Sequence, residues 1–111
     1  MNIEELRNYC LSKPGAWEDL PFDEKTLVFK VMNKMFALTD LEDPNLSINL
    51  KCQPEDCLSL RETYDAVNPG YHMNKKHWIT VYIDGSLSDS LIYNWIDASY
   101  WLVTQKLTKK E

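Results

Sequence analysis

The stretch NPGYHMNKKHWITVYID, residues 68–84, decides the fold that the rest of the chain is expected to adopt. Its start predicts a sharp turn, because Pro69 fixes its own φ angle and Gly70 permits a positive φ. Its end predicts a strand, because β-branched and aromatic residues alternate over residues 78–84. The polar run between them, residues 71–77, holds two histidines and two lysines. Such a run is typical of a loop that binds a ligand or is held by its own side chains.

Upstream of this stretch, residues 27–32 and 35–39 predict a β-hairpin around Asn33-Lys34. Asn tolerates the positive φ that the first position of a two-residue turn requires. This turn fixes a register in which the apolar side chains of both strands share one face of the sheet. The main members of that face are Phe29, Val31, Phe36 and Leu38.

The other elements follow from hydrophobic periodicity and from capping residues. We expect helices over residues 3–12, over 54–64, and from Ser86 or Ser88 towards the C-terminus, a strand over 46–51, and an acidic loop over 16–24. The order α-β-β-β-α-(β)-β-α predicts a single α+β domain over residues 1–111. Its two layers would be an antiparallel β-sheet and helices packed on one face of that sheet.

The charge balance limits the kind of ligand that the chain can hold. The sequence has 12 basic and 17 acidic residues among 111, which gives a net charge of −5 and a pI near 5.0. A negative total charge argues against strong non-specific binding to nucleic acid. Residues 1–24 hold two basic against six acidic residues, whereas residues 25–53 hold four lysines against three acidic residues. Any anion site must therefore be local and lie outside the N-terminal region.

Cys10, Cys52 and Cys57 are odd in number, and no pair has the CxxC spacing. This pattern favours reduced thiols in a cytoplasmic protein over a disulfide framework. The sequence shows no basic-then-apolar leader and no apolar run of membrane-spanning length. We therefore expect a soluble protein in the cytoplasm with no membrane partner.

The sequence offers no convincing set of catalytic or metal-binding residues. His72 and His77 have no acidic or cysteine partner at ligand spacing, so we expect no metal and no cofactor. Cys10 and Cys57 fall on apolar helix stripes, where a cysteine is usually core rather than nucleophile. The carboxylates of residues 16–24 are typical of a solvated acidic surface. We therefore predict that the protein is not an enzyme.

The face of the sheet that the helices leave open is the candidate binding surface. Lysines interleaved with aromatic residues can hold phosphates while bases stack. An apolar patch on the same face can instead bury itself in a homodimer or against another protein. The residues alone favour neither alternative. The apolar patch would include Met32, Met35 and Trp78.

Motifs in order along nearly the whole chain resemble those of the MmcQ/YjbR family. They are Pro14-Gly15, Glu18-x-x-Pro21-Phe22, Phe29-Lys30-Val31-x-x-Lys34-Met35-Phe36-Ala37, Leu50-Lys51-x-x-Pro54-Glu55, Pro69-Gly70-Tyr71-His72-x-Asn74-Lys75-x-His77-Trp78 and Ser99-Tyr100. The chain departs from the family at Asn33, where the family usually has glycine. Asn can adopt the same backbone conformation, so the hairpin is still expected.

The resemblance implies a small bacterial protein with the two-layer α+β fold also seen in secretion chaperones and likened to that of CyaY. It implies DNA binding through a double-wing arrangement of hairpins, with the tip at Asn33-Lys34 and the loop Tyr71–Trp78 as the candidate wings, and it implies no catalytic residues. The net charge of −5 and the small number of lysines predict that this binding is weak and non-specific. The alternative is a protein-interaction or chaperone-like module that uses the open sheet face. On the DNA hypothesis the contacts are Lys30, Lys34, Lys51, Tyr71, His72, Asn74, Lys75, Lys76, His77 and Trp78.

Overall fold

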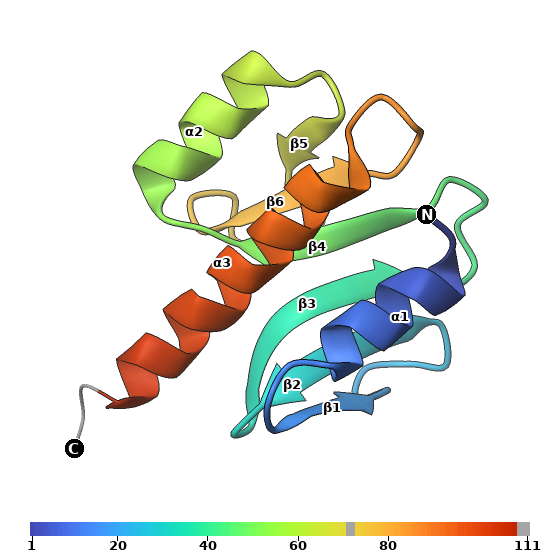
Figure 1. Cartoon of the computed structure of the whole chain (residues 1–111), viewed down its shortest axis with the longest axis vertical. Helices are drawn as coiled ribbons and strands as arrows, with labels where there is room; N and C mark the ends of the chain where they lie inside the picture. The colour runs from blue at the N-terminus through green and yellow to red at the C-terminus, as the bar shows by residue number, and fades with distance from the viewer. Residues whose placement is uncertain (71–72, 109–111) are drawn as a thin grey trace.

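One antiparallel six-stranded sheet carries three helices on one of its faces (Figure 1). This computed structural model describes residues 1–70 and 73–108. The strands lie in the order β1-β2-β3-β4-β6-β5. The elements are α1 (Ile3–Leu11), β1 (Ala16–Asp19), β2 (Thr26–Val31), β3 (Lys34–Asp40), β4 (Ser47–Lys51), α2 (Pro54–Thr63), β5 (Val67–Pro69), β6 (Trp78–Tyr82) and α3 (Asp89–Thr108). The predicted α+β class is confirmed.

The main core lies between the sheet and the helices. All three helices contribute to it, α1 through Leu6, α2 through Cys57 and α3 through Ile92 and Ile96. α1 and α3 lie across the strands, and α2 lies beside β5 and β6 (Figure 1). No helix within the described residues is long and apolar enough to cross a lipid bilayer.

β1 forms where the sequence predicts a loop, so that prediction is wrong for residues 16–19. The four residues of β1 lack the apolar alternation of a typical strand, and neighbouring elements hold them in place. β1 pairs with β2 along its length, and Arg7 of α1 donates its Nε hydrogen bond to Glu18 at 2.7 Å. This hydrogen bond lowers the pKa of the Glu18 carboxyl below its usual value.

The turn between β2 and β3 lies at Met32-Asn33, one residue earlier than predicted. Both residues have positive φ angles, 50° and 66°, as a type I′ turn requires. Val31 therefore pairs with Lys34. Glycine or asparagine at the first position would predict such a turn from the sequence, whereas Met32 does not.

A register shift then separates the two ends of the hairpin. Lys30 pairs with Met35, but Phe29 pairs with Ala37, so Phe36 is an extra residue on β3. Phe36 and Ala37 both enter the main core as a result. The prediction that Leu38 shares a face with Phe29 is wrong, because the bulge turns Leu38 to the opposite face.

The second face of the sheet is not an open surface over its whole width. Val28 and Leu38 are buried there against Trp78, and Met35 and Met73 pack on them. We call these five residues the second core. Trp78 is only 8% exposed. The apolar residues predicted to form an exposed patch are therefore largely buried against other residues of the same chain. Of Met32, Met35 and Trp78, only Met32, at the turn, is highly exposed, at 63%.

A serine from α3 closes the gap that the bulge opens between β3 and β4. The two strands pair directly at Ala37–Leu50 and Leu38–Asn49. Beyond these pairs, Ser99 Oγ accepts a hydrogen bond from the Lys51 N–H at 2.9 Å and donates one to the Phe36 carbonyl at 2.6 Å. Ser99 is fully buried. Its hydroxyl thus takes the place of a direct bond between the strands.

The turn assignment can be tested with matched variants. The double change Met32→Asn and Asn33→Gly should raise the free energy of unfolding by about 1 kcal/mol, because both new residues favour positive φ. Asn33→Val should lower it by about 1 kcal/mol or more. Lys34→Gly should also lower it, since Lys34 is a strand residue. Urea denaturation measures all three, and a stabilising Lys34→Gly would place the turn at residues 33–34 instead.

The bridging role of Ser99 predicts a large effect for a small change. Ser99→Ala leaves the Lys51 N–H and the Phe36 carbonyl without their partner, so the free energy of unfolding should fall by roughly 2–4 kcal/mol. Ser59→Ala, at an exposed position of α2, is the control and should change it by less than about 0.5 kcal/mol. Equal effects of the two variants in thermal and urea melts would show that the Ser99 hydroxyl is not a structural bridge.

Candidate functional site

The sheet register gathers lysines from three separate segments around the second core. Lys30 pairs with Met35 and Lys51 pairs with Trp78, two members of that core. Lys34 precedes Met35 at the tip of the hairpin, where it pairs with Val31 of the main core, and Lys75 and Lys76 lie between Met73 and Trp78. These five lysines therefore come from the hairpin, from β4 and from the loop before β6. We call the set the lysine rim, and its members are Lys30, Lys34, Lys51, Lys75 and Lys76.

The five lysines differ in whether their ammonium groups already contact a carboxylate, an aromatic ring or a backbone carbonyl of the chain. Lys30 Nζ lies 3.2 Å from an Asp19 carboxylate oxygen and 5.2 Å from the centre of the Trp17 ring. Lys75 Nζ donates a hydrogen bond to the Gly70 carbonyl at 3.2 Å. Lys34 and Lys76 are exposed and have no ion pair among the described residues. These two lysines are therefore the most accessible charges of the rim.

The loop before β6 is held by its own hydrogen bonds. Asn74 Oδ1 accepts a hydrogen bond from the Lys76 N–H at 2.9 Å, and the His77 carbonyl accepts one from the Cys52 N–H at 2.9 Å. A methyl group on Gly70 would lie 2.8 Å from the Trp78 Cβ, which explains why a glycine stands there. Asn74 and the backbone of His77 thus have structural partners. The predicted contacts Tyr71 and His72 lie outside the described residues.

Arg61 joins this site although the sequence does not point to it. Its guanidinium donates a hydrogen bond to the Lys75 carbonyl at 3.1 Å and thereby ties the end of α2 to the loop. A basic residue in the last turn of a helix is common because it favours the helix dipole. No sequence signal therefore separates this arginine from an ordinary surface residue.

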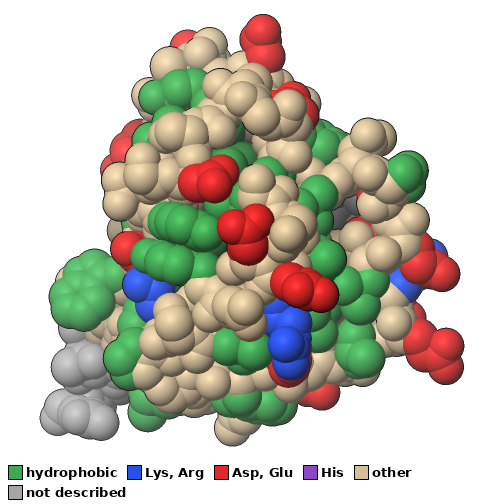
Figure 2. All heavy atoms as spheres, turned by 45° about the vertical axis from the view of Figure 1, so that its right-hand side comes forward, with side chains coloured by type: hydrophobic (Ala, Val, Ile, Leu, Met, Phe, Trp, Pro, Cys, Tyr) green, Lys and Arg blue, Asp and Glu red, His purple; other side chains and the backbone are tan. Residues whose placement is uncertain are grey.

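The helix-bearing side of the molecule shows no comparable gathering of positive charge. In the view of Figure 2, acidic side chains are spread over the surface and the few basic ones lie apart from one another. Two of the basic residues on α1 and its following turn are paired, Arg7 with Glu18 and Lys13 with Asp97.

The cysteines differ from the sequence expectation. Cys52 and Cys57 form a disulfide with a Cα–Cα distance of 5.8 Å, so the prediction of three reduced thiols is wrong. The end of β4 and the first turn of α2 bring the two residues together, which the spacing in sequence does not show. Cys10 is free and buried, and burial raises the pKa of its thiol to about 12. A thiol in this state is a poor nucleophile.

The carboxylates of residues 16–24 are held apart by separate partners. Glu18 is paired with Arg7 and Asp19 with Lys30, while Asp23 accepts hydrogen bonds from the backbone of Lys25 and Thr26. Within residues 1–70 and 73–108, no group of three or more His, Cys, Asp or Glu side chains is placed to hold a metal ion.

Comparisons with known proteins agree on one family. A model of the YjbR family matches residues 11–102. The Escherichia coli K12 protein named YjbR is 44% identical over 100 residues, which cover 90% of this chain and 85% of that protein. YbdF of Escherichia coli O157:H7 is 40% identical over 97% of this chain and 88% of its own length. A crystal structure from Deinococcus radiodurans, 43% identical, superposes with a TM-score of 0.88 over 95% of this chain and 80% of that one. A crystal structure from Pseudomonas syringae, 32% identical, superposes with a TM-score of 0.79 over 92% of this chain and 98% of that one.

The state of the cysteines can be measured by counting reactive thiols. Without reductant, the native protein should react with a thiol reagent at no site, because Cys10 is buried and the other two cysteines are bonded. Denaturation should expose one thiol per chain, and reduction before denaturation should expose three. Three thiols in denaturant without any reductant would mean that Cys52 and Cys57 are not bonded.

Proposed function

We propose that this chain, which belongs to the YjbR family, is a non-enzymatic binding protein that contacts the phosphates of DNA through the lysine rim. Lysines from three segments of an acidic chain lie at or next to residues that pair with the second core, with Lys34 at the tip of the adjoining hairpin, and this arrangement supports the proposal. Phosphate contacts need positive charge at defined places, and lysines neutralise phosphates without reading bases. Binding should therefore be weak and indifferent to sequence.

The second core and the sheet fix the backbone positions from which the rim lysines extend. The rim residues lie on strands and in residues 73–77, which hydrogen bonds tie to Gly70, to Cys52 and to Arg61 of α2. A positioned set of charges loses less conformational entropy on binding than a set on a mobile loop. Trp78, however, is 8% exposed, so it supports the loop and is not placed to stack on bases.

The proposal that the chain is not an enzyme is supported by the state of its reactive groups. The free thiol is buried, and Glu18, Asp19 and Asp23, three of the four carboxylates of residues 16–24, have separate partners. A protein-interaction or chaperone-like role on the second face, and self-association through Met32, Met35 and Trp78, stay predictions. They have less support, because the second core already buries most of that apolar surface. A cytoplasmic location also stays a prediction.

A fluorescence-anisotropy titration with mixed-sequence duplex DNA, at low and at moderate salt, tests the DNA proposal. The dissociation constant at low salt should be about 10⁻⁴–10⁻⁶ M and should rise with salt. Lys34→Glu and Lys76→Glu should each weaken binding several-fold for all sequences alike, because both lysines are exposed members of the rim.

Lys13→Glu is the matched control for these variants. It changes the net charge of the protein by the same amount, but Lys13 follows α1 on the helix-bearing side, where it pairs with Asp97 of α3. It should leave binding nearly unchanged. The absence of binding at low salt, or equal effects of all three charge reversals, would contradict the proposal and favour a protein partner.

A further inference from the structure

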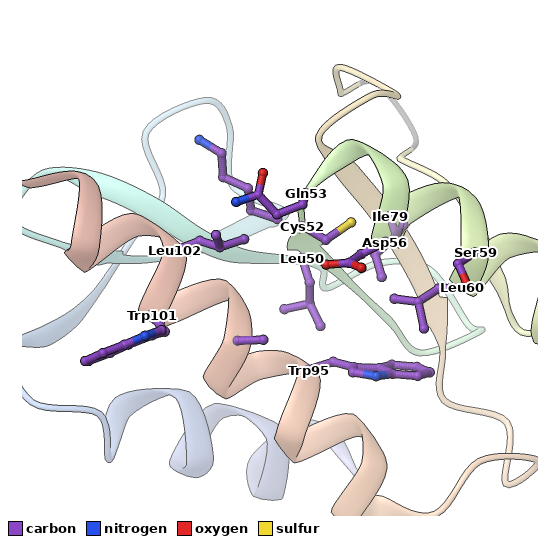
Figure 3. Close-up of a pocket in the computed structure, with 12 residues that line it drawn as sticks. Leu50, Cys52, Gln53, Asp56, Ser59, Leu60, Ile79, Trp95, Trp101 and Leu102 are labelled. Atoms are coloured by element: carbon purple, nitrogen blue, oxygen red, sulfur yellow. The ribbon is translucent and has the colours of Figure 1, made fainter.

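A second candidate site lies on the helical side of the sheet, between α2 and α3. A cavity of about 380 Å³ opens there (Figure 3). This size is within the range of small-molecule sites in proteins. Leu50 of β4 and Ile79 of β6 form its floor, α2 contributes Leu60, and α3 contributes Trp95, Trp101 and Leu102. Most of the lining is therefore aliphatic or aromatic.

Two charged residues border the cavity, and they differ in the direction of their side chains. Alternation along β4 places Leu50 in the main core and Lys51 on the other face, where it pairs with Trp78. The Asp56 carboxylate, in contrast, lies beside Cys52 above Leu50 and is turned towards the cavity (Figure 3). None of the described residues donates a hydrogen bond to it. The cavity thus presents a negative charge to its contents.

The aromatic side chains that line the cavity also favour a positively charged ligand. Trp95 is held edge-on against Tyr64, with ring centroids 5.3 Å apart, and so offers a fixed wall. Trp101 is 61% exposed on α3, at the border of the cavity. Indole rings attract cations through their faces, and a carboxylate strengthens that preference. Glu55 and Asp56 both lie in the first turn of α2, where an acidic residue also favours the helix dipole, but the Asp56 carboxylate is the one that borders the cavity.

We propose that this cavity binds an organic ammonium ion with an apolar body. The body would lie against Leu50, Leu60 and Leu102, and the ammonium group would lie at the Asp56 carboxylate. This site is argued from other residues than the DNA proposal: Lys51 also borders the cavity, but it pairs with Trp78 of the second core. Either proposal can fail without the other.

Calorimetric titration with three ligands of equal tail length tests the proposal: octylammonium, octan-1-ol and octanoate, each below the concentration at which it forms micelles. The wild-type protein should bind octylammonium most tightly and octanoate most weakly. Asp56→Asn should weaken octylammonium binding about five-fold and leave octan-1-ol unchanged, as expected for the loss of one partly exposed charge contact. Glu55→Gln is the matched control, since it removes the same charge one residue away, and it should preserve the order of affinities.

Ala98→Phe should weaken the binding of all three ligands, because residue 98 is exposed on α3 and borders the cavity, so a larger side chain fills it. In the wild type, the methyl resonances of Leu50 and Leu60 should shift on titration with octylammonium, which locates the site without any variant. The proposal is wrong if no ligand binds, if octanoate binds as tightly as octylammonium, if Asp56→Asn and Glu55→Gln have equal effects, or if the methyl resonances do not move.

Discussion

The hydroxyl of Ser99 joins two strands that would otherwise separate. An extra residue at Phe36 ends the direct pairing of β3 with β4, and a gap in a sheet leaves backbone groups without partners. Ser99 satisfies one donor and one acceptor at this gap from a fully buried position on α3. Tyr100, the next residue, packs edge-on against Phe36 and donates a hydrogen bond to the Pro14 carbonyl. One turn of α3 therefore fixes the helix on the sheet and holds the sheet together.

The bulge at Phe36 also determines what the second face of the sheet can do. Two consecutive residues of β3 enter the main core, and Leu38 turns to the other side, where it meets Val28 and Trp78. A face that seems open from the strand pattern is thereby partly closed by its own apolar residues. The charged residues at the border of this face thereby gain a rigid support. The proposed contacts to phosphates would use such a support, because it fixes where the charges lie without making the binding strong.

β4 separates two kinds of chemistry within two residues. Leu50 belongs to the main core and lines the cavity between α2 and α3, whereas Lys51 borders the same cavity but pairs with Trp78 of the second core. Side chains of adjacent strand residues point to opposite faces, so the two proposed sites use different sides of one strand. Cys52 and Cys57 then join the end of β4 to α2, the helix that supplies Asp56.

The sequence by itself determined the α+β class, the three helices, the main strands and the identity of the lysines near the candidate site. These follow from local periodicity, capping and turn residues, which act within a few positions of the chain. Tertiary structure alone decided the exact turn at Met32-Asn33, the strand β1, the Cys52–Cys57 bond and the cavity at Asp56. The turn depends on a one-residue shift, which exchanges the two faces of a strand. The strand β1 and the cavity depend on contacts between segments far apart in sequence. The Cys52–Cys57 bond joins residues five apart, but it depends on how α2 folds back after β4, which the spacing does not show.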